Sequence, residues 1–281
     1  MRLSFVFILS SCLLFAQEKS PYALFAKSGQ QTTYAKLLDA AAKSEVVLFG
    51  EYHDNSVVHW LELELAKDLA AKAPLVLGAE MFEADNQLQL NAYLAGTINQ
   101  KQLDSLARLW PNYKTDYKPL VDLAKLSTVP FIATNIPRKY ASLVYKKGFD
   151  ALLDLPEQEK SWMAALPIYY DASLPGYANM LAEMGGHGGD NLPKAQAIKD
   201  ATMAYFINKN LPAMGVFLHY NGTYHSDNFE GIGFYLNRAN PLLRLLTIAT
   251  VTQADLSKLE TDNRSKADFI LVIDEDVAKS Y

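Results

Sequence analysis

Six short apolar runs recur along the chain with helical segments between them, and this alternation restricts the fold more than any other feature. The runs are bounded by turn-forming or polar residues, as in strands buried on both faces of a sheet. After the first run, Asp54, Asn55 or Ser56 can cap a helix that continues to about Ala73. Strands that alternate with helices predict an α/β fold, in which helices flank a mostly parallel central sheet. The predicted strands are Val46–Phe49, Leu75–Leu77, Phe131–Ala133, Val216–Leu218, Leu245–Ala249 and Phe269–Ile273.

The third and fourth of these runs are separated by a long stretch without a convincing strand. It carries helical patches, several Pro and Gly breaks, and a long helical segment over Leu192–Asn210. The chain has 281 residues, of which 50% are hydrophobic, enough for one large domain or a domain with an insertion. We therefore predict a smaller helical subdomain, at about residues 138–210, inserted in the sheet domain.

The N-terminus has the pattern of a targeting segment. Arg2 precedes an apolar run, from Leu3 to Ala16, that is too short to span a bilayer and is typical of a signal peptide. Cleavage after Ala16 would remove residues 1–16 and leave a domain over 17–281. Alternatively, Leu9-Ser10-Ser11-Cys12 resembles a lipobox, which would leave a lipidated Cys12. Both routes predict export, to the periplasm or as a membrane-anchored lipoprotein of a bacterial envelope.

Charge and cysteine content exclude several classes of site. The net charge is −5, so the chain lacks the overall basic footprint of nucleic-acid-binding proteins, and we expect no nucleic-acid partner. Cys12 is the only cysteine, so the mature chain has no internal disulfide, thiolate metal site or cysteine nucleophile. Any metal or cofactor must therefore be held by other side chains.

Polar side chains follow four of the predicted strands. In a parallel sheet these strand ends share one edge, which is where open α/β sheets bind ligands. Solvation of turns does not require such a set, and we predict a shared ligand site at this edge. The residues, in strand order, are Glu51 and His53; Glu80 and Glu83; Asn135 and Arg138; and His219, Asn221 and His225.

Two chemistries fit these side chains. Four of them form a mixed carboxylate–imidazole set for Zn, Mn, Fe or Co: Glu51, His53, Glu80 and His225. Alternatively, Glu and His act as a base and its orienting partner on a bound water. Arg138 is predicted either to clamp an anionic group, such as a carboxylate or propionate, or to be a surface arginine. His59, on the first helix, is predicted to be a packed or surface histidine.

A glycine-rich segment forms a second candidate region. Four glycines surround His187 in Met184-Gly185-Gly186-His187-Gly188-Gly189, and both methionine and histidine are iron ligands in proteins. The alternative is a flexible linker before the next helix. Aromatic side chains in the helical regions could line a flat apolar ligand: Tyr169, Tyr170, Tyr177, Trp110, Tyr113 and Tyr117.

Taken together and in order, these pieces resemble the ChaN-like family of iron-regulated, haem-binding proteins, within the superfamily that also holds Tiki, TraB and erythromycin-esterase-like proteins. The resemblance spans roughly Glu45 to Leu236. It rests on Gly50-Glu51-Tyr52-His53-Asp54, Gly78-Ala79-Glu80-Met81-Phe82, Asp116-Tyr117-Lys118-Pro119-Leu120, Asn135-Ile136-Pro137-Arg138, Met184-Gly185-Gly186-His187, the segment from Gln196 to Ala204, and Asn221-Gly222-Thr223-Tyr224-His225 with Gly231-Ile232.

The resemblance implies an exported haem-binding protein that serves haem or iron uptake, with envelope uptake components as partners. It also implies a homodimer that holds haem between its subunits through tyrosine and histidine. Tyr117 and His187 are the expected haem contacts, with Asn135 and Arg138 as further cofactor-binding residues.

The wider superfamily implies a different activity. It suggests a metal-dependent hydrolase, similar to a peptidase or esterase, whose catalytic and metal-binding residues are Glu51, His53, Glu80 and His225. A third alternative is a strand-end pocket that binds a ligand without turnover. Haem is the expected cofactor of the leading hypothesis, and a divalent metal that of the second.

Overall fold

The structure is a computed structural model that describes residues 19–183 and 189–281. Its centre is an eight-stranded sheet with the order β2-β1-β8-β7-β3-β6-β4-β5. The six strands from β8 to β5 run parallel, and β1 and β2 add an antiparallel edge. The strands are β1 (Tyr22–Ala26), β2 (Gln31–Thr32), β3 (Val46–Glu51), β4 (Leu75–Glu83), β5 (Phe131–Asn135), β6 (Val216–Gly222), β7 (Leu245–Gln253) and β8 (Phe269–Asp274).

The α/β fold with a mostly parallel sheet is confirmed. All six predicted strands are present as β3 to β8, while β1 and β2 add two strands that the sequence pattern does not identify. The helices are α1 (Tyr34–Ala41), α2 (Ser56–Ala70), α3 (Gln87–Leu94), α4 (Gln100–Leu106), α5 (Lys118–Ser127), α6 (Arg138–Lys147), α7 (Glu157–Lys160), α8 (Pro175–Glu183), α9 (Asn191–Lys209) and α10 (Ile232–Ala239).

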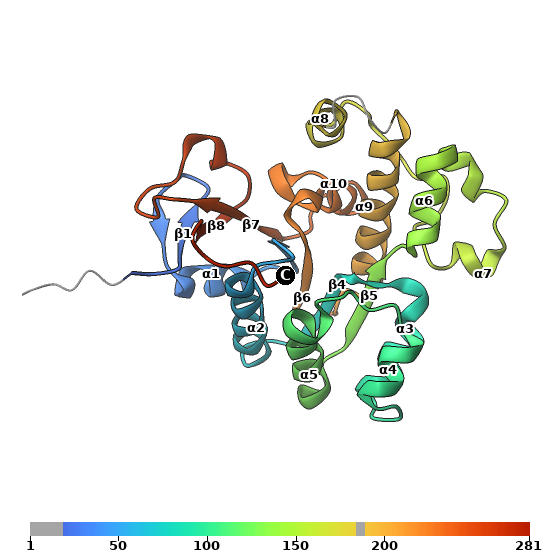
Figure 1. Ribbon diagram of the computed structural model, residues 1–281, viewed down its shortest axis with the longest axis horizontal. Coiled ribbons are helices and arrows are strands. Elements are labelled where there is room, and N and C mark those ends of the chain that lie inside the picture. The colour runs from blue at the N-terminus through green and yellow to red at the C-terminus, as the bar shows by residue number, and fades with distance from the viewer. Residues whose placement is uncertain (1–18, 184–188) are drawn as a thin grey trace, which may run out of the picture.

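Helices cover both faces of the sheet (Figure 1). On one face α1, α2 and α5 pack against alternate strand residues such as Val47, Phe49 and Leu77. On the other face α9 and α10 cover the intervening residues, including Leu48 and Phe217. Because successive side chains of a strand point to opposite faces, a parallel strand between two helical layers must be apolar on both. This requirement explains the continuous apolar runs in the sequence.

Where the structure describes the connection from β5 to β6, it carries the four α-helices α6 to α9. Tyr140 and Val144 of α6 pack with Met163 and Ile198 into a small core of their own. The last helix, α9, also packs on the sheet through Met203 and its neighbours. The predicted helical region between these strands therefore has both a separate small core and a direct attachment to the main sheet.

The helix that follows β3 begins as its capping residues predict. Asn55 is the N-cap of α2, and its side chain accepts hydrogen bonds of 3.1 Å from the backbone N–H groups of Val57 and Val58. This cap fixes the start of α2 directly behind the end of β3. Within residues 19–183 and 189–281, none of the helices combines the length and apolar character needed to cross a membrane.

Candidate functional site

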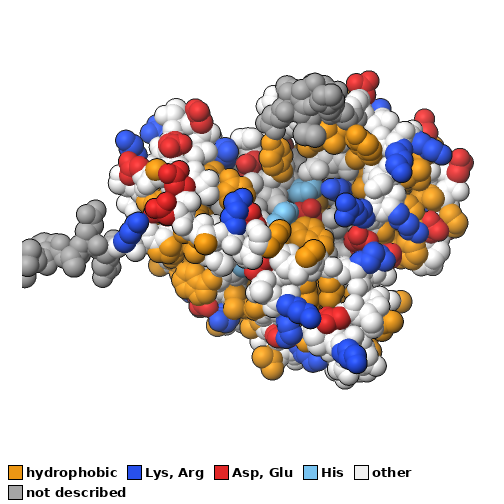
Figure 2. All heavy atoms as spheres, in the orientation of Figure 1, with side chains coloured by type: hydrophobic (Ala, Val, Ile, Leu, Met, Phe, Trp, Pro, Cys, Tyr) orange, Lys and Arg blue, Asp and Glu red, His pale blue; other side chains and the backbone are white. Residues whose placement is uncertain are grey.

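The carboxyl ends of β3, β6 and β4 meet at one edge of the sheet, as in other parallel sheets. β6 lies between β3 and β4, and Glu51 is paired in register with Gly222. A cavity of about 490 Å³ opens there, and we call it the strand-edge pocket. Figure 2 shows histidine side chains at the floor of this hollow, with a basic side chain beside them. All four predicted catalytic and metal-binding residues line it: Glu51, His53, Glu80 and His225.

Glu51 and His53 form one carboxylate–imidazole pair of the pocket. The Nδ1 atom of His53 donates to Glu51 Oε1 over 2.6 Å, and the hydroxyl of Tyr117 donates to the same oxygen. Glu51 is 2% exposed, whereas the His53 side chain is 34% exposed. The preceding Gly50 allows a close approach, because a Cβ atom there would lie 2.8 Å from the backbone oxygen of Ile248.

Electrostatics favour the charged forms of this pair. Burial opposes ionisation of Glu51, but its hydrogen bonds and nearby histidines outweigh burial and lower its pKa to about 2. Burial likewise opposes protonation of His53, but Glu51 and then Glu80 outweigh it and raise the His53 pKa. The pair is therefore held as a carboxylate beside an imidazole that accepts a proton readily.

Glu80 and His225 form the second pair. Glu80 Oε2 accepts a 2.9 Å hydrogen bond from the backbone N–H of Gly222, and Glu80 Oε1 lies 3.1 Å from His225 Nε2. The other ring nitrogen of His225 donates to Asp200 on α9, and Tyr177 donates to the second Asp200 oxygen over 2.8 Å. Two carboxylates therefore fix His225 from both sides.

This arrangement favours an imidazolium at His225. Burial alone would lower its pKa, but the charges of Glu80 and Asp200 dominate and raise the pKa to about 9. Burial would raise the pKa of Glu80, yet attraction to His225 and His53 holds that pKa well below its usual range. The second pair is therefore favoured as an ion pair.

Gly222 separates the two pairs. A Cβ atom at this position would lie 2.9 Å from His53 Nε2 and 3.6 Å from Glu80 Oε2. Only a glycine at position 222 therefore leaves room for the His53 ring to lie against β6, next to the backbone N–H that binds Glu80. The two histidines also end matching motifs, Gly50-Glu51-Tyr52-His53 and Gly222-Thr223-Tyr224-His225. Each motif brings a histidine from a strand exit to the same pocket.

A second polar group lies behind Glu51. Glu51, His59 and Glu62 offer ligand atoms that all lie within 4.8 Å of one another, and all three residues are buried. We call this group the buried cluster. His59 is 5% exposed, as expected for a packed histidine, and it lies against the Tyr117 ring as well as against carboxylates. Burial first, and then repulsion from Glu51, raises the pKa of Glu62 well above its usual range.

The predicted cofactor-binding residues have different environments. Tyr117 is 1% exposed, and its hydroxyl is bonded to Glu51. Asn135 is buried at the end of β5, and its side-chain amide donates a hydrogen bond of 3.1 Å to the backbone oxygen of Glu80. Arg138 is exposed at the start of α6 and does not line the strand-edge pocket. His187 lies outside the described residues, as does the predicted signal segment over residues 1–16.

All six predicted strands extend further than their apolar residues predict, and β4 and β6 are clear examples. The apolar runs end at Leu77 and Leu218, whereas β4 continues to Glu83 and β6 to Gly222. Backbone pairing with neighbouring strands does not depend on apolar side chains, so polar residues continue both strands. Several side chains predicted to follow a strand therefore lie inside one, and that part of the prediction is wrong for Glu51, Glu80, Glu83, Asn135, His219 and Asn221. Burial lowers the pKa of His219 to about 4, which keeps it neutral.

The sequence pattern did not identify three polar residues that contact this site. Asp200 and Gln196 are one turn apart on α9, and the Gln196 amide lies 2.9 Å from His225 Nδ1. Glu62 follows His59 by three residues on α2, which places both on one face of the helix. That spacing was the available signal for Glu62. For Gln196 and Asp200 the available signal was the segment from Gln196 to Ala204, on which the family resemblance rests. Their contacts with His225 could not be predicted, because that of Asp200 spans 25 residues.

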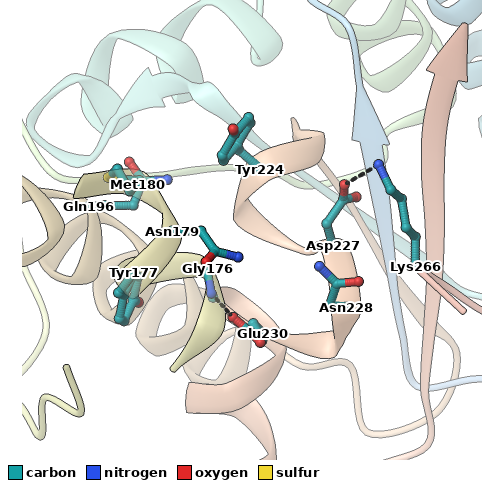
Figure 3. A pocket seen from close by; sticks show the side chains of 11 residues that line it. Gly176, Tyr177, Asn179, Met180, Gln196, Tyr224, Asp227, Asn228, Glu230 and Lys266 are labelled. Carbon is teal, nitrogen blue, oxygen red and sulfur yellow. Dashed lines mark hydrogen bonds and ion pairs between the residues drawn. The ribbon is translucent and has the colours of Figure 1, made fainter. Parts of the chain in front are cut away.

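A smaller cavity of about 180 Å³ adjoins the strand-edge pocket and shares Met180, Gln196 and Tyr224 with it. In Figure 3, Asp227 and Lys266 face each other across one wall of this cavity. Burial raises the pKa of Asp227 to about 6, although Thr223 and Lys266 oppose the shift. The site therefore has a polar side chamber next to its histidine pairs.

Comparison with known proteins gives a consistent assignment. The family model described as "Haem-binding uptake, Tiki superfamily, ChaN" matches residues 37–236. No curated relative is similar enough in sequence to match the chain.

Three solved structures share the fold at low sequence identity. The structure of ChaN of Campylobacter jejuni with cofacial haem matches with a TM-score of 0.67 and 15% identity, over 90% of this chain and 96% of that chain. The type III effector HopBA1 matches with a TM-score of 0.51 and 11% identity, over 85% of this chain and 92% of that chain. A Bacillus cereus protein matches with a TM-score of 0.51 and 14% identity, over 85% of this chain and 90% of that chain.

The family model covers most of the chain, from α1 to α10, and includes the residues of both histidine pairs. The structure of the Campylobacter protein shows that the same fold accompanies this family elsewhere. The chain therefore belongs to the ChaN family of haem-binding uptake proteins, in the Tiki superfamily.

Proposed function

We propose that this protein is an exported haem-binding protein that serves haem or iron uptake. The observation that carries the proposal is the match of the haem-binding uptake family to residues 37–236. The signal-peptide pattern of residues 1–16 supports export, with lipidation at Cys12 as the second processing route. Envelope uptake components are the partners that this role requires.

The strand-edge pocket has side chains suited to haem. Histidine and tyrosine are haem-iron ligands in proteins, and bound haem supplies the iron that the protein would carry. His53 is partly exposed, and its hydrogen bond to Glu51 uses Nδ1, which leaves Nε2 as the nitrogen for iron. A carboxylate on the far nitrogen fixes the ring and increases its basicity. Lys199, which also lines the pocket, offers a positive charge for a propionate.

Tyr117 and His187 remain proposed haem contacts, with Asn135 and Arg138 as further cofactor-binding residues. Direct binding of Tyr117 to iron would break an existing contact, because its buried hydroxyl donates a hydrogen bond to Glu51. While that hydrogen bond persists, Tyr117 acts on haem only by positioning Glu51 and His53. Arg138 is exposed and can reach an anionic group only outside the strand-edge pocket.

Titration of the mature protein with haemin tests the proposal. We expect a shifted Soret band, which weakens in His53→Ala, Tyr117→Phe and His187→Ala. Tyr145→Phe is the matched control, since Tyr145 is an exposed tyrosine on α6 and its hydroxyl should not matter. A wild-type protein that gives no Soret shift would rule out haem binding.

We also propose that haem is held between two subunits of a homodimer. The expected result is a haemin-dependent increase in molar mass, measured by light scattering after size-exclusion chromatography. A chain that binds haemin and stays monomeric would retain the haem proposal and reject the shared site.

A metal-dependent hydrolase is the second candidate function. The observation in its favour is the convergence of Glu51, His53, Glu80 and His225 on one pocket, since this donor set suits a divalent metal. Such a metal lowers the pKa of bound water and so provides a nucleophile. Here Asp200 would orient His225 from behind, as it does in the metal-free protein.

Metal analysis and a screen of peptide and ester substrates, with and without Mn or Co, distinguish the two candidates. A hydrolase should show metal-dependent turnover that Glu51→Gln abolishes. The hydrolase proposal fails if no turnover appears with metal and the Glu51→Gln variant behaves like the wild type.

A further inference from the structure

The buried cluster lies on the opposite side of Glu51 from the strand-edge pocket. Glu51 uses Oε1 for His53 and Tyr117, while its Oε2 lies 3.9 Å from His59 Nδ1. His59 and Glu62 come from the first turns of α2, which the Asn55 cap fixes behind β3. The cluster is therefore built from two rigid elements.

The hydrogen bonds of His59 define which of its nitrogens carries a proton. Nε2 lies 3.0 Å from the backbone oxygen of His53, and a carbonyl can only accept, so Nε2 is a donor. Nδ1 lies 2.9 Å from Glu62 Oε2 and 3.9 Å from Glu51 Oε2. A neutral imidazole of this tautomer would present a lone pair to two carboxylates. A further proton or a metal ion must therefore lie among the three groups.

Two carboxylate oxygens of the cluster remain without hydrogen-bond partners. Glu51 Oε2 and Glu62 Oε1 are buried and accept no hydrogen bond from the part of the chain that the structure describes. Buried carboxylate oxygens are costly unless they are paired, protonated or coordinated to a metal. The two unpaired oxygens belong to the same two residues that face His59, so the missing proton or metal ion lies between them.

We propose that Glu51, His59 and Glu62 form a binding centre for a divalent transition-metal ion, separate from the histidine pairs of the strand-edge pocket. Two carboxylates and one imidazole suit Zn²⁺, Mn²⁺ or Fe²⁺, and a ligating histidine commonly donates its other N–H to a carbonyl. His59 already has this bond to His53. Glu51 also lines the strand-edge pocket, so the cluster and the pocket share this one residue.

Measurement of metal binding to the full-length mature protein tests the proposal. Zn²⁺ and Mn²⁺ binding would be followed by calorimetry and by metal content after dialysis, with Co²⁺ as an optical probe of the ligands. We expect Glu62→Gln and His59→Gln each to weaken binding by at least about 10-fold, since both remove a ligand. Neither readout depends on haem, so the outcome is separate from the haem proposal.

Two control variants locate the ion. Glu64→Gln makes the same change two residues away, at a partly exposed glutamate paired with Lys67, and should bind like the wild type. Glu80→Gln instead removes a side chain of the pocket set, so it distinguishes an ion held by the pocket from one held by the buried cluster. If Glu80→Gln loses the ion, or Glu62→Gln keeps it, the ion belongs to the pocket and the proposal is wrong.

A proton shared between Glu51 and Glu62 is the alternative occupant of the cluster. In that case the wild-type protein binds none of the three ions, which would overturn the proposal. Circular dichroism would establish that each variant is folded. Should His59→Gln fail to fold, the near-isosteric Glu62→Gln still decides the result.

Discussion

The strand-edge pocket and the buried cluster use the same residue types at different depths. In the pocket, His53 pairs with Glu51 and is 34% exposed; in the cluster, His59 pairs with Glu62 and its side chain is 4% exposed. Glu51 contributes to both. An accessible imidazole can exchange its proton or bind a ligand, whereas a buried one must keep its counter-charges matched. The two sites contain the same residue types, so burial decides their roles. The exposed His53 can bind a ligand from solvent, whereas the buried His59 can only stabilise the fold or hold a metal ion.

The titration behaviour of the two histidines follows this difference. Burial disfavours the charged form of both, but Glu62 and Glu51 together raise the pKa of His59 to about 10. The pKa of His53 is also raised, mainly by Glu51. The raised pKa therefore favours the protonated form of His59 beside Glu51 and Glu62.

The largest expected effect is on stability, from the loss of His59. His59→Leu would remove the buried imidazole that lies beside Glu51 and Glu62, and loss of one partner of a buried ion pair costs about 3–5 kcal/mol. Denaturant unfolding of the metal-free protein measures this change. His53→Leu is the comparison at the exposed site and should cost about 1 kcal/mol. Equal losses at the two positions would show that depth does not separate them.

Gly222→Ala should disturb the pocket and leave the buried cluster intact. The added Cβ would meet His53 Nε2 at 2.9 Å, so the ring must move, at a cost of about 2 kcal/mol that is typical of overpacking. We expect weaker haemin binding but unchanged metal binding at Glu62. Gly233→Ala in α10 is the control, because its Cβ meets Leu245 only at 3.6 Å.

Tyr117→Phe tests the residue that connects the two regions through Glu51. Removal of the hydroxyl takes one hydrogen bond from a buried carboxylate, which costs about 1–2 kcal/mol. Tyr145→Phe should change the free energy of unfolding by less than about 0.5 kcal/mol. If the two variants have equal stability, the Tyr117–Glu51 bond makes no contribution.

The smallest expected effect is a pH dependence in the side chamber. The folded-state pKa of Asp227 is raised to about 6 by burial, above its ordinary value of 3.8. Its protonated form therefore stabilises the fold below about pH 4, and this contribution is lost as the pH rises through about 6. Because Asp227 is partly exposed, we expect a loss of about 1 kcal/mol.

Asp227→Asn removes this titration without changing the side-chain shape. Its free energy of unfolding should therefore fall less than that of the wild type between pH 4 and pH 7. The measurement is a series of denaturation curves across this range. Parallel pH profiles for the two proteins would contradict the raised pKa.

Much of the fold could be predicted from local pattern. The apolar runs identified β3 to β8 because strands buried on both faces must be continuously apolar. The edge strands β1 and β2 were missed, since they form an antiparallel addition with a short and partly exposed sequence. Strand ends were placed too early where polar residues continue the backbone pairing, as at Glu83 and Gly222.

The sequence by itself determined the α/β class and the edge at which Glu51, His53, Glu80 and His225 lie, because parallel strand ends converge. Only the tertiary structure decided how these residues pair and how deep each one lies. Contacts such as Asp200 with His225 depend on the register of elements distant in sequence, which local periodicity does not encode. Burial likewise comes from the packing of whole layers, and it places Tyr117, His59 and Glu62 behind the pocket rather than in it.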